Sequence, residues 1–511
     1  MDERAYIELK GITKTFGSVV ANHNVDFSVR KGEIHALLGE NGSGKSTLVN
    51  MLSGIYVPDS GFIYIDGKEV RFDSPNAAIA AGIGMVHQHF KLVDAMTAKE
   101  NIAAGQKRGL TFKGKKLATE LYNIARKYGL VINPDKYIDE MSVSEQQNVE
   151  IMKMLYRGAD VLILDEPTAV LTPQEIERFF DILRKMREEG CAIIIITHKM
   201  NEVMEISDRV TVLRKGESIA TVNTAEVEPK ALTDMMVGYA IDLSIKRDIM
   251  PLVDKKPLLE VEHLTINGER GAKVIDDMSF RLFSGEVLGV AGIAASGQKE
   301  LCEAVVGLYE VDSGSIKMEG DELVGMSPIE ILKKGVSMSF VPEDRLGMGL
   351  VGALDIVDNV ILKSYRLDKG LLVDRKKGEA LAQEIIDTFD VSTPSIHHQI
   401  KKLSGGNIQK VLLGREIKSD PNVLITAYPA RGLDIGAAYN IYNVINEERK
   451  RGVGVLYIGE DLDVLIELCD RIMVMSHGKI MKIVDAREVT KETLGLLMLG
   501  QDAEAKEAEY V

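Results

Sequence analysis

The sequence lacks the features that would mark a membrane-spanning or exported chain. No apolar run approaches the roughly 18 to 20 residues needed to cross a bilayer, and the longest strand-like stretch is the short segment 193–196. The first ten residues, MDERAYIELK, are charged and contain few apolar residues. We therefore expect neither a transmembrane segment nor a signal peptide.

Cysteine and positive charge are also scarce. The three cysteines, Cys191, Cys302 and Cys469, lie too far apart for a metal-ligand spacing, so we expect small buried core residues in a reducing cytosol. The formal net charge of −15 at pH 7 argues against nucleic-acid binding, which needs clustered Lys and Arg. It also argues against direct adsorption to an anionic membrane. Any membrane attachment should therefore go through a protein partner.

What the chain does contain is a copy of itself. Its 511 residues exceed what one hydrophobic core usually supports, and residues 31–70 align without a gap with residues 284–323. Further on, VLILDEP at 161–167 aligns with VLITAYP at 423–429. Internal repetition of this kind predicts two related domains. We place them at residues 1–245 and 258–500, with a short charged linker at 246–257 and an acidic tail at 501–511.

Each copy has the pattern of an α/β domain. Short β-branched runs such as 192–197 alternate with amphipathic stretches such as 173–189. That alternation predicts a largely parallel sheet covered by helices.

A complete G-x-x-x-x-G-K-[ST] loop lies between the apolar segment 34–38 and a helix-like run from Leu48. Its glycines allow backbone N–H groups to surround phosphate, and the helix dipole favours an anion there. We expect Lys45 to reach the β- and γ-phosphates of a nucleotide and Ser46 to coordinate Mg²⁺. The residues predicted to bind nucleotide in this loop are Gly39, Asn41, Gly42, Ser43, Gly44, Lys45, Ser46 and Thr47.

Polar residues that follow apolar strands complete the candidate site. Asp165 is suited to hold Mg²⁺ through water, and Glu166 to orient or deprotonate an attacking water. A DE pair at a strand end is usually a solvated loop, but here it follows a phosphate loop. His198 could contact the γ-phosphate, although a lone His after a strand is more often a surface or core residue. Gln88 is the remaining candidate for metal and water, although glutamines are common in loops.

In this order, these residues resemble the ATP-binding cassette (ABC) family, over nearly all of both copies. The first copy is similar to the family in its Walker A motif at 39–47, its Q-loop at Gln88, its Walker B pair Asp165 and Glu166, and its switch histidine His198.

The resemblance extends to the adenine site, the signature motif and the fold. Phe16 lies where the family places an aromatic residue that stacks on adenine, and the LSGGQ signature occurs as residues 403–407 of the second copy. The family implies two tandem nucleotide-binding domains, each with a P-loop NTPase core, an antiparallel β subdomain and a helical subdomain. It also implies head-to-tail pairing of the domains, here within one chain, with each ATP between one domain's Walker motifs and the other's signature.

The second copy has lost the Walker chemistry. Its phosphate loop has neither the lysine that binds phosphate nor the serine that binds the metal. The two carboxylates and the histidine are also replaced. The replacements are Gln298 for Lys45, Lys299 for Ser46, Glu300 for Thr47, Ala427 for Asp165, Tyr428 for Glu166 and Glu460 for His198.

The signature shows the opposite pattern. In the first copy, Val143 and Ser144 replace glycines whose small size lets N–H groups approach the γ-phosphate, and Glu145 adds a negative charge. The first copy also has Thr172 where the second keeps Asp434. We therefore expect one complete and one degenerate composite site. The complete site joins the first copy's Walker residues with Ser404, Gly405, Gly406, Asn407 and Asp434.

This resemblance implies an ATPase subunit of a membrane importer, with ATP and Mg²⁺ as ligands. We expect peripheral attachment at the cytoplasmic face of the membrane through two integral-membrane permease subunits, with a substrate-binding lipoprotein as an indirect partner. The stretches at 82–102 and 165–175 are most similar to the nucleoside branch of the family, and import of simple sugars such as ribose or galactose is the alternative.

Two other classes fit less well. A soluble tandem cassette acting on ribosomes should have two intact ATP sites and a long basic linker. A metabolic P-loop kinase should have an acceptor pocket and has no use for a signature motif.

Overall fold

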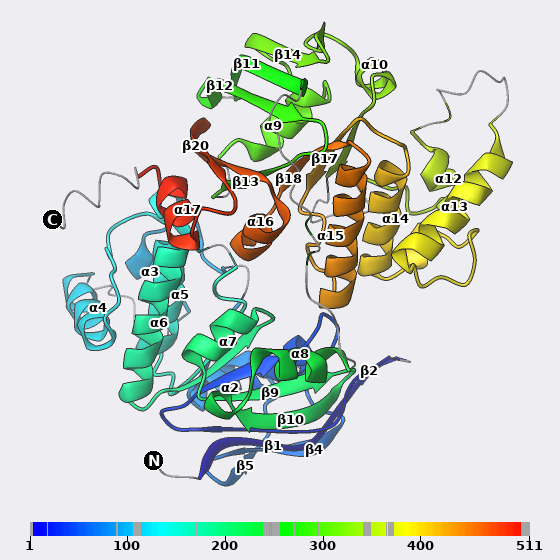
Figure 1. Ribbon diagram of the computed structural model, residues 1–511. Coiled ribbons are helices and arrows are strands. Elements are labelled where there is room, and N and C mark those ends of the chain that lie inside the picture. Colours follow the sequence, from blue (N-terminus) through cyan, green and yellow to red (C-terminus); the bar gives the residue numbers. More distant parts are fainter. Residues whose placement is uncertain are drawn as a thin grey trace. The chain divides into compact units, whose positions relative to one another are not determined.

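The computed structural model forms two compact units, Met1–Asp242 and Leu243–Val511, which follow one another along the chain in Figure 1. Of the linker expected at 246–257, residues 247, 256 and 257 are described, and the strand β11 already begins at Pro257. No helix within the described residues is long and apolar enough to cross a bilayer. The structure describes residues 4–17, 19–87, 90–105, 114–169, 171–238, 245, 247, 256–268, 271–293, 296–340, 349–363, 365 and 373–501.

The first unit is built on a six-stranded sheet in the order β10-β9-β3-β8-β7-β6. All its neighbouring strands run parallel except β10, which is antiparallel to β9. Every residue of β3 and β8 is buried, as expected for apolar strands covered on both faces. The strands are β3 (Ile34–Leu38), β6 (Ile83–Val86), β7 (Val161–Asp165), β8 (Ala192–Thr197), β9 (Arg209–Arg214) and β10 (Glu217–Asn223).

An antiparallel four-stranded sheet of order β2-β1-β4-β5 packs beside the main sheet of this unit. One hydrophobic cluster joins Leu9 of the small sheet, Leu48 of helix α1 and Ile163 of the main sheet. The small sheet is therefore part of the same core. Its strands are β1 (Ala5–Phe16), β2 (Val19–Arg30), β4 (Ser60–Ile65) and β5 (Lys68–Val70), and α1 is Lys45–Leu52.

A second hydrophobic cluster holds a helical subdomain around Leu121, Val149 and Ile151. Helices α3, α4 and α5 contact one another there, and α6 covers the main sheet. The helices of the first unit are α2 (Pro75–Ala80), α3 (Ala98–Ala103), α4 (Gly114–Tyr128), α5 (Val143–Tyr156), α6 (Pro173–Glu188), α7 (Met200–Ile206) and α8 (Pro229–Val237).

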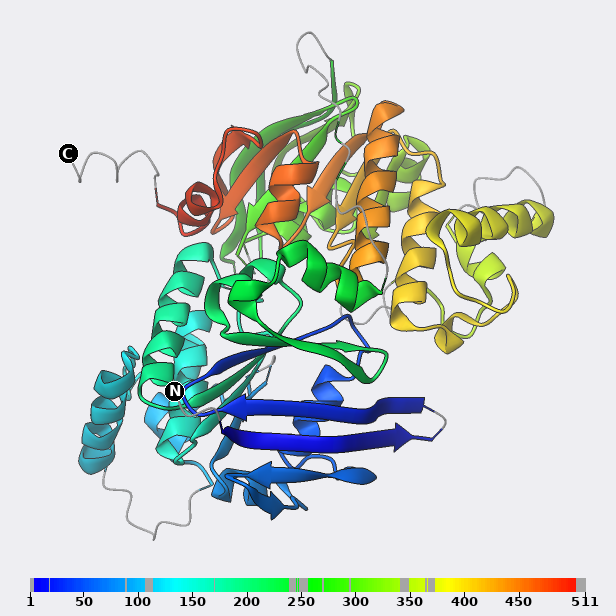
Figure 2. The ribbon, with the colours of Figure 1, turned by 60° about the horizontal axis from the view of Figure 1, so that its bottom comes forward.

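The second unit repeats this architecture. Its sheets have the orders β16-β17-β18-β13-β19-β20 and β12-β11-β14-β15, and α13 and α14 lie side by side in its helical subdomain (Figures 1 and 2). The strands are β11 (Pro257–Asn267), β12 (Lys273–Phe283), β13 (Val287–Gly292), β14 (Ser313–Met318), β15 (Asp321–Glu322), β16 (Val336–Phe340), β17 (Val423–Ala427), β18 (Gly454–Ile458), β19 (Arg471–Ser476) and β20 (Lys479–Asp485). The helices are α9 (Gln298–Val305), α10 (Pro328–Lys333), α12 (Ile356–Ile361), α13 (Arg375–Phe389), α14 (Gly405–Ile417), α15 (Ile435–Lys450), α16 (Leu462–Leu468) and α17 (Lys491–Met498). The predicted fold class, two tandem α/β cassettes, is confirmed.

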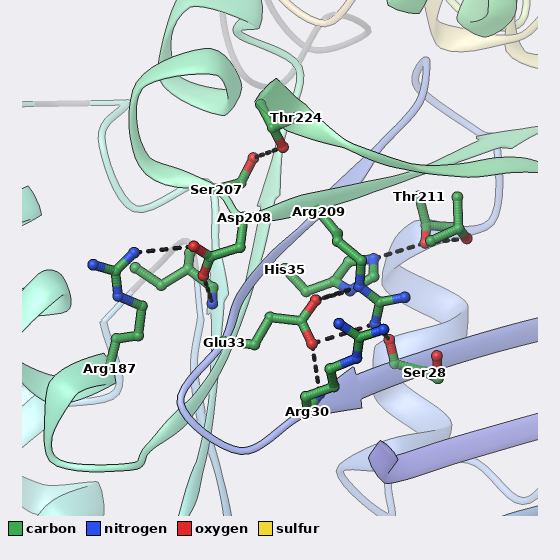
Figure 3. Close-up of polar contacts among 12 residues, drawn as sticks. Ser28, Arg30, Glu33, His35, Arg187, Ser207, Asp208, Arg209, Thr211 and Thr224 are labelled. Atoms are coloured by element: carbon green, nitrogen blue, oxygen red, sulfur yellow. Dashed lines mark hydrogen bonds and ion pairs between the residues drawn. The ribbon is translucent and has the colours of Figure 1, made fainter. Parts of the chain in front are cut away.

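A buried polar network fixes the amino-terminal end of β3 (Figure 3). Glu33 accepts hydrogen bonds from Nε of Arg209 at 2.6 Å and from the backbone N–H of Arg30 at 2.6 Å. His35 bridges Glu33 at 3.1 Å and the hydroxyl of Thr211 at 2.7 Å. The network thus ties β3 to β9 and to the end of β2.

The second unit keeps the glutamate–arginine pair of this network. Nε of Arg471 donates to Glu286 at 2.6 Å, as Arg209 does to Glu33. Glu286 and Glu33 each immediately precede the central strand, at the end opposite the phosphate loop. A network that both units retain serves the fold itself, because only one of them has the Walker residues.

Candidate active site

The carboxyl ends of three neighbouring strands bring the predicted site residues of the first unit together. Leu38 of β3 pairs with Thr197 of β8, and Asp165 of β7 pairs with Ile196. The phosphate loop, the Asp165–Glu166 pair and His198 follow these strand ends directly. Residues far apart in sequence therefore meet at one edge of the sheet, where ligands bind in open α/β folds.

The phosphate loop has the backbone shape that its glycines allow. Gly44 is the N-cap of α1 with a φ of 99°, a left-handed conformation that residues with a side chain rarely adopt. A Cβ atom at Gly44 would lie 2.4 Å from the carbonyl oxygen of Ala21, and one at Gly39 would lie 2.3 Å from that of Leu213. Both glycines are therefore required by close backbone packing as well as by the turn.

Lys45 lies folded back over its own loop. Its Nζ donates to the carbonyl oxygens of Gly39 at 2.7 Å and Glu40 at 2.9 Å, and its side chain is buried. Burial lowers the pKa of Lys45, and the carboxylates of Glu166, Asp165 and Glu40 act in the opposite direction. Within the described residues this buried ammonium is held by carbonyl oxygens, and it is well placed to exchange them for phosphate oxygens.

The rest of the loop is open to a phosphate group. Ser46, Asn41 and Gly42 are exposed, Thr47 and Gly44 are half-buried, and α1 has no acidic residue in its first turn. The buried hydroxyl of Ser43 finds no hydrogen-bond partner among the described residues. Because a buried polar group without a partner is costly, this hydroxyl fits a site that an acceptor oxygen completes.

The pKa values of Asp165 and Glu166 are shifted in opposite directions because their surroundings differ. Burial, and then the adjacent Glu166 carboxylate, raise the pKa of Asp165 to about 6, against the opposing effect of Lys45. Nδ1 of His198 lies 3.0 Å from Oε1 of Glu166, and this hydrogen bond lowers the pKa of Glu166 despite its burial. Glu166 is thus ionised and suited to accept a proton, whereas Asp165 is held for a cation that would keep it charged.

Phe16 lies at the end of β1 and is 43% exposed. Its ring meets that of Tyr56 edge-on, with the centroids 5.2 Å apart, and Nζ of Lys14 lies 5.6 Å from the Phe16 centroid. Phe16 is therefore a partly exposed ring at the end of β1, in contact with Tyr56 and Lys14. Tyr56 was not predicted, and Gln88 lies outside the described residues.

Comparison with known proteins agrees with this geometry. The family described as ABC transporter matches residues 22–169 and 275–429, which together are more than half of the chain. The chain belongs to the ABC transporter family. The ATP-binding domains of this family are called cassettes, and ATP-binding proteins of the family are ATPases. Each of the two units is one cassette.

Relatives match both cassettes over almost their whole length. The nucleoside import ATP-binding protein NupA of Lactococcus lactis subsp. cremoris is 42% identical, covering 98% of this chain and 99% of the relative. The guanosine import ATP-binding protein NupO of Bacillus subtilis is 43% identical, covering 97% of each chain. The ribose import ATP-binding protein RbsA 1 of Rubrobacter xylanophilus is 40% identical, covering 98% of this chain and 99% of that protein.

A solved structure shares the fold at lower identity. In the complex of the archaeal ribosomal stalk protein aP1 with the archaeal ribosome recycling factor aABCE1, the matching chain is 18% identical with a TM-score of 0.61. The match covers 94% of this chain and 90% of that one. This likeness shows the fold alone.

The second cassette keeps the backbone of the site and changes its chemistry. Gly297 caps α9 with a φ of 99°, as Gly44 caps α1. Tyr428 has a φ of 55° and Glu166 one of 46°, and each donates its backbone N–H to the neighbouring strand. The strained backbone therefore does not depend on the carboxylate. Glu300 places a negative charge in the first turn of α9, where α1 has none.

The two signature helices differ at their amino-terminal ends. In the first cassette Glu145 accepts the backbone N–H of Ser142 at 2.8 Å and pairs with Nζ of Lys136 at 2.7 Å, so a carboxylate already caps α5. In the second cassette Ser404 caps α14, and Nδ2 of Asn407 donates to its hydroxyl at 2.9 Å. No acidic residue lies in the first turn of α14. Its positive end therefore remains suited to an external anion.

Asp434 and Thr172 have a shared structural role. The Asp434 carboxylate accepts the N–H of Ala437 at 2.7 Å at the start of α15, and the Thr172 hydroxyl caps α6 in the same way. The replacement therefore keeps the cap but changes the charge. The Ser-x-x-Glu pattern at 142–145 is a sequence signal for such a cap, so Glu145 completes a capping box as well as adding the negative charge expected there.

Proposed function

We propose that this chain is the ATP-hydrolysing subunit of a nucleoside importer. The observation that carries the proposal is the likeness to NupA and NupO at 42% and 43% identity over nearly the full length of both proteins. Import of ribose or a related sugar is the second candidate, because RbsA 1 matches at 40% identity over a similar length.

In the proposed complex, the chain works at the cytoplasmic face of the membrane with two permease subunits, and a substrate-binding lipoprotein delivers the solute to them. Uptake of labelled nucleosides and of ribose by cells with and without the gene tests the substrate. We expect loss of nucleoside uptake with ribose uptake unchanged. Loss of ribose uptake alone would favour the second candidate, and co-purification of the tagged chain would identify its permeases.

Hydrolysis is proposed to use the residues of the first cassette. Glu166 accepts the proton of the attacking water, and His198 keeps that carboxylate ionised and oriented through the 3.0 Å contact. Lys45 leaves its loop carbonyls for the β- and γ-phosphates, and Phe16 stacks on adenine. Ser46, Asp165 and Gln88 would hold Mg²⁺, and the ion would supply a positive charge that offsets the phosphate charge.

The catalytic site is proposed to be composite, completed in the ATP-bound state by the second cassette's signature. The residues from that cassette are Ser404, Gly405, Gly406, Asn407 and Asp434. Support comes from the two helix ends: that of α14 has no carboxylate, whereas that of α5 is capped by Glu145.

Charge-matched substitutions at the two caps test the composite site. Ser404→Glu should place a carboxylate at α14 and lower steady-state ATPase activity about 100-fold, comparable to loss of one transition-state contact. Ser142→Glu at α5 is the matched control and should leave activity within about twofold. Equal effects of the two variants would contradict a single composite site.

A further inference from the structure

A second buried network joins the loop that follows Glu166 to the loop that carries His198. The hydroxyl of Thr168 donates to Oε1 of Glu202 at 2.5 Å, and the hydroxyl of Thr197 donates to Oε2 of the same carboxylate at 3.2 Å. Glu202 lies on α7, so one carboxylate connects three elements: the loop after β7, the end of β8 and a helix.

Lys199 closes this network. Its Nζ lies 3.1 Å from Oε1 of Glu202 and donates to the carbonyl oxygen of Thr168 at 3.3 Å. Its backbone N–H donates to the hydroxyl of Thr197 at 3.1 Å. The residue on each side of His198 is therefore bonded to the network, while His198 itself points to Glu166.

The carboxylate of this network and its two threonines are almost fully enclosed, whereas Lys199 reaches them from a partly exposed position. Thr168, Thr197 and Glu202 are 2%, 3% and 7% exposed. Burying a carboxylate is costly unless hydrogen bonds compensate, and apolar packing could fill the same space more cheaply. The polar arrangement therefore needs a reason other than stability.

The second cassette shows that the fold does not need it. The equivalent β17, β18 and α16 are all present, yet the aligned residues are Ala430 for Thr168, Gly459 for Thr197, Asp461 for Lys199 and Val464 for Glu202. Every member that bonds through its side chain has changed. The Glu33–Arg209 network, in contrast, persists as Glu286–Arg471.

The Glu202 network thus occurs in the cassette that has Glu166 and His198 and is lost with them. We propose that Glu202 is a positioning residue for ATP hydrolysis: through Thr168 and Thr197 it holds the two loops so that His198 and Glu166 stay in contact. This inference rests on the proposed catalytic role of Glu166. Glu202 itself touches neither nucleotide nor water in this scheme.

The test replaces the network by the apolar set that the second cassette packs. The triple variant Thr168→Ala, Thr197→Gly, Glu202→Val and the single variant Glu202→Val are assayed for steady-state ATPase activity in the full chain. We expect kcat to fall about 100-fold, as for a misplacement of about 1 Å, with KM for ATP within about twofold. Glu202→Gln should retain kcat within about threefold, because an amide can still bond both hydroxyls.

A purely structural role would not lower kcat while sparing KM, and Glu202→Gln would not rescue it. Val464→Ala in α16 is the matched control and should leave kcat and KM unchanged. Wild-type kcat in the folded triple variant would overturn the proposal, and so would a loss of activity explained wholly by unfolding or by KM.

Glu166→Gln, measured beside these variants, separates this proposal from the proposed function. If Glu166→Gln retains activity, the catalytic role of Glu166 is wrong and the positioning role fails with it. If Glu166→Gln is inactive while Glu202→Val behaves as wild type, only the positioning role is wrong.

Discussion

Gln298 occupies in the second cassette the place that Lys45 occupies in the first, and both side chains donate back to their own loops. Nζ of Lys45 bonds the carbonyl oxygen of Gly39 at 2.7 Å, and Nε2 of Gln298 bonds that of Ile293 at 3.1 Å. Both side chains are buried. The geometry has been kept while the charge that binds phosphate has been lost.

The first prediction compares these two positions. Lys45→Ala should lower ATPase activity by about 10²- to 10³-fold, since removing one charge-stabilising group costs about 3 kcal/mol of barrier. Gln298→Ala loses only a neutral hydrogen bond within its loop and should keep activity within about twofold. Steady-state phosphate release by the full chain measures both. A similar loss in Gln298→Ala would mean that the second loop also takes part in hydrolysis.

The raised pKa of Asp165 makes a second prediction. Burial and the Glu166 carboxylate hold this pKa at about 6, and a bound divalent cation requires the charged form. Binding of Mg²⁺ with ATP should therefore weaken below about pH 6, with Asp165 releasing about half a proton at pH 6 and close to one proton about a pH unit below it. Calorimetry in buffers of different ionisation enthalpy measures the released proton. Asp165→Asn, which has no proton to release at this position, should reduce the number of protons released by the contribution of Asp165.

The contact between His198 and Glu166 makes a third prediction. The hydrogen bond lowers the pKa of Glu166, so the carboxylate stays ionised to a lower pH than an ordinary one. His198→Ala should raise that pKa and move the acidic limb of kcat to higher pH at saturating Mg²⁺ and ATP, where the cation keeps Asp165 charged. A general base contributes about 10²- to 10⁴-fold, so kcat should also fall. Glu460→Ala, at the aligned position of the second cassette, is the control and should leave the acidic limb of kcat where it is.

The elements that carry the nucleotide site could be predicted because their signals are local. The G-x-x-x-x-G-K-[ST] loop, the apolar strand before it and the carboxylates at 165–166 are each contiguous in sequence. The self-alignment then gave the equivalent positions of the second cassette. Fold class and family follow from such patterns, and both are confirmed by the structure and the comparisons.

The positioning contacts could not be predicted in this way. Thr168 and Glu202 are separated by 34 residues, and a Thr or Glu near a strand end has no spacing that identifies a partner. The edge contact of Tyr56 with Phe16 likewise brings together a loop and a distant strand. Only the fold shows which of these residues meet, and only the comparison of the cassettes shows which contacts are dispensable.

The last prediction concerns stability and uses the network that both cassettes share. Burial alone would raise the pKa of Glu33, but hydrogen bonds from His35 and Arg209 hold it at about 2, below its ordinary value of 4.5. A lowered pKa stabilises the fold above pH 4.5, and this stability is lost as pH falls towards 2. Glu33→Gln should therefore cost on the order of 3 kcal/mol at neutral pH and almost nothing near pH 2.

Glu286 should behave in the opposite way, because Leu288 replaces the histidine that helps Glu33. The effect of burial on Glu286 is larger than that of the hydrogen bond from Arg471, so the pKa of Glu286 is raised. A raised pKa means that the contribution of Glu286 to stability is greatest at low pH and falls as pH rises through the folded-state pKa. Glu286→Gln should then cost little at neutral pH. Urea unfolding followed by hydrogen exchange, with peptides assigned to each cassette, measures both variants from pH 2 to 7. The same pH trend in both would show that His35 does not set the difference.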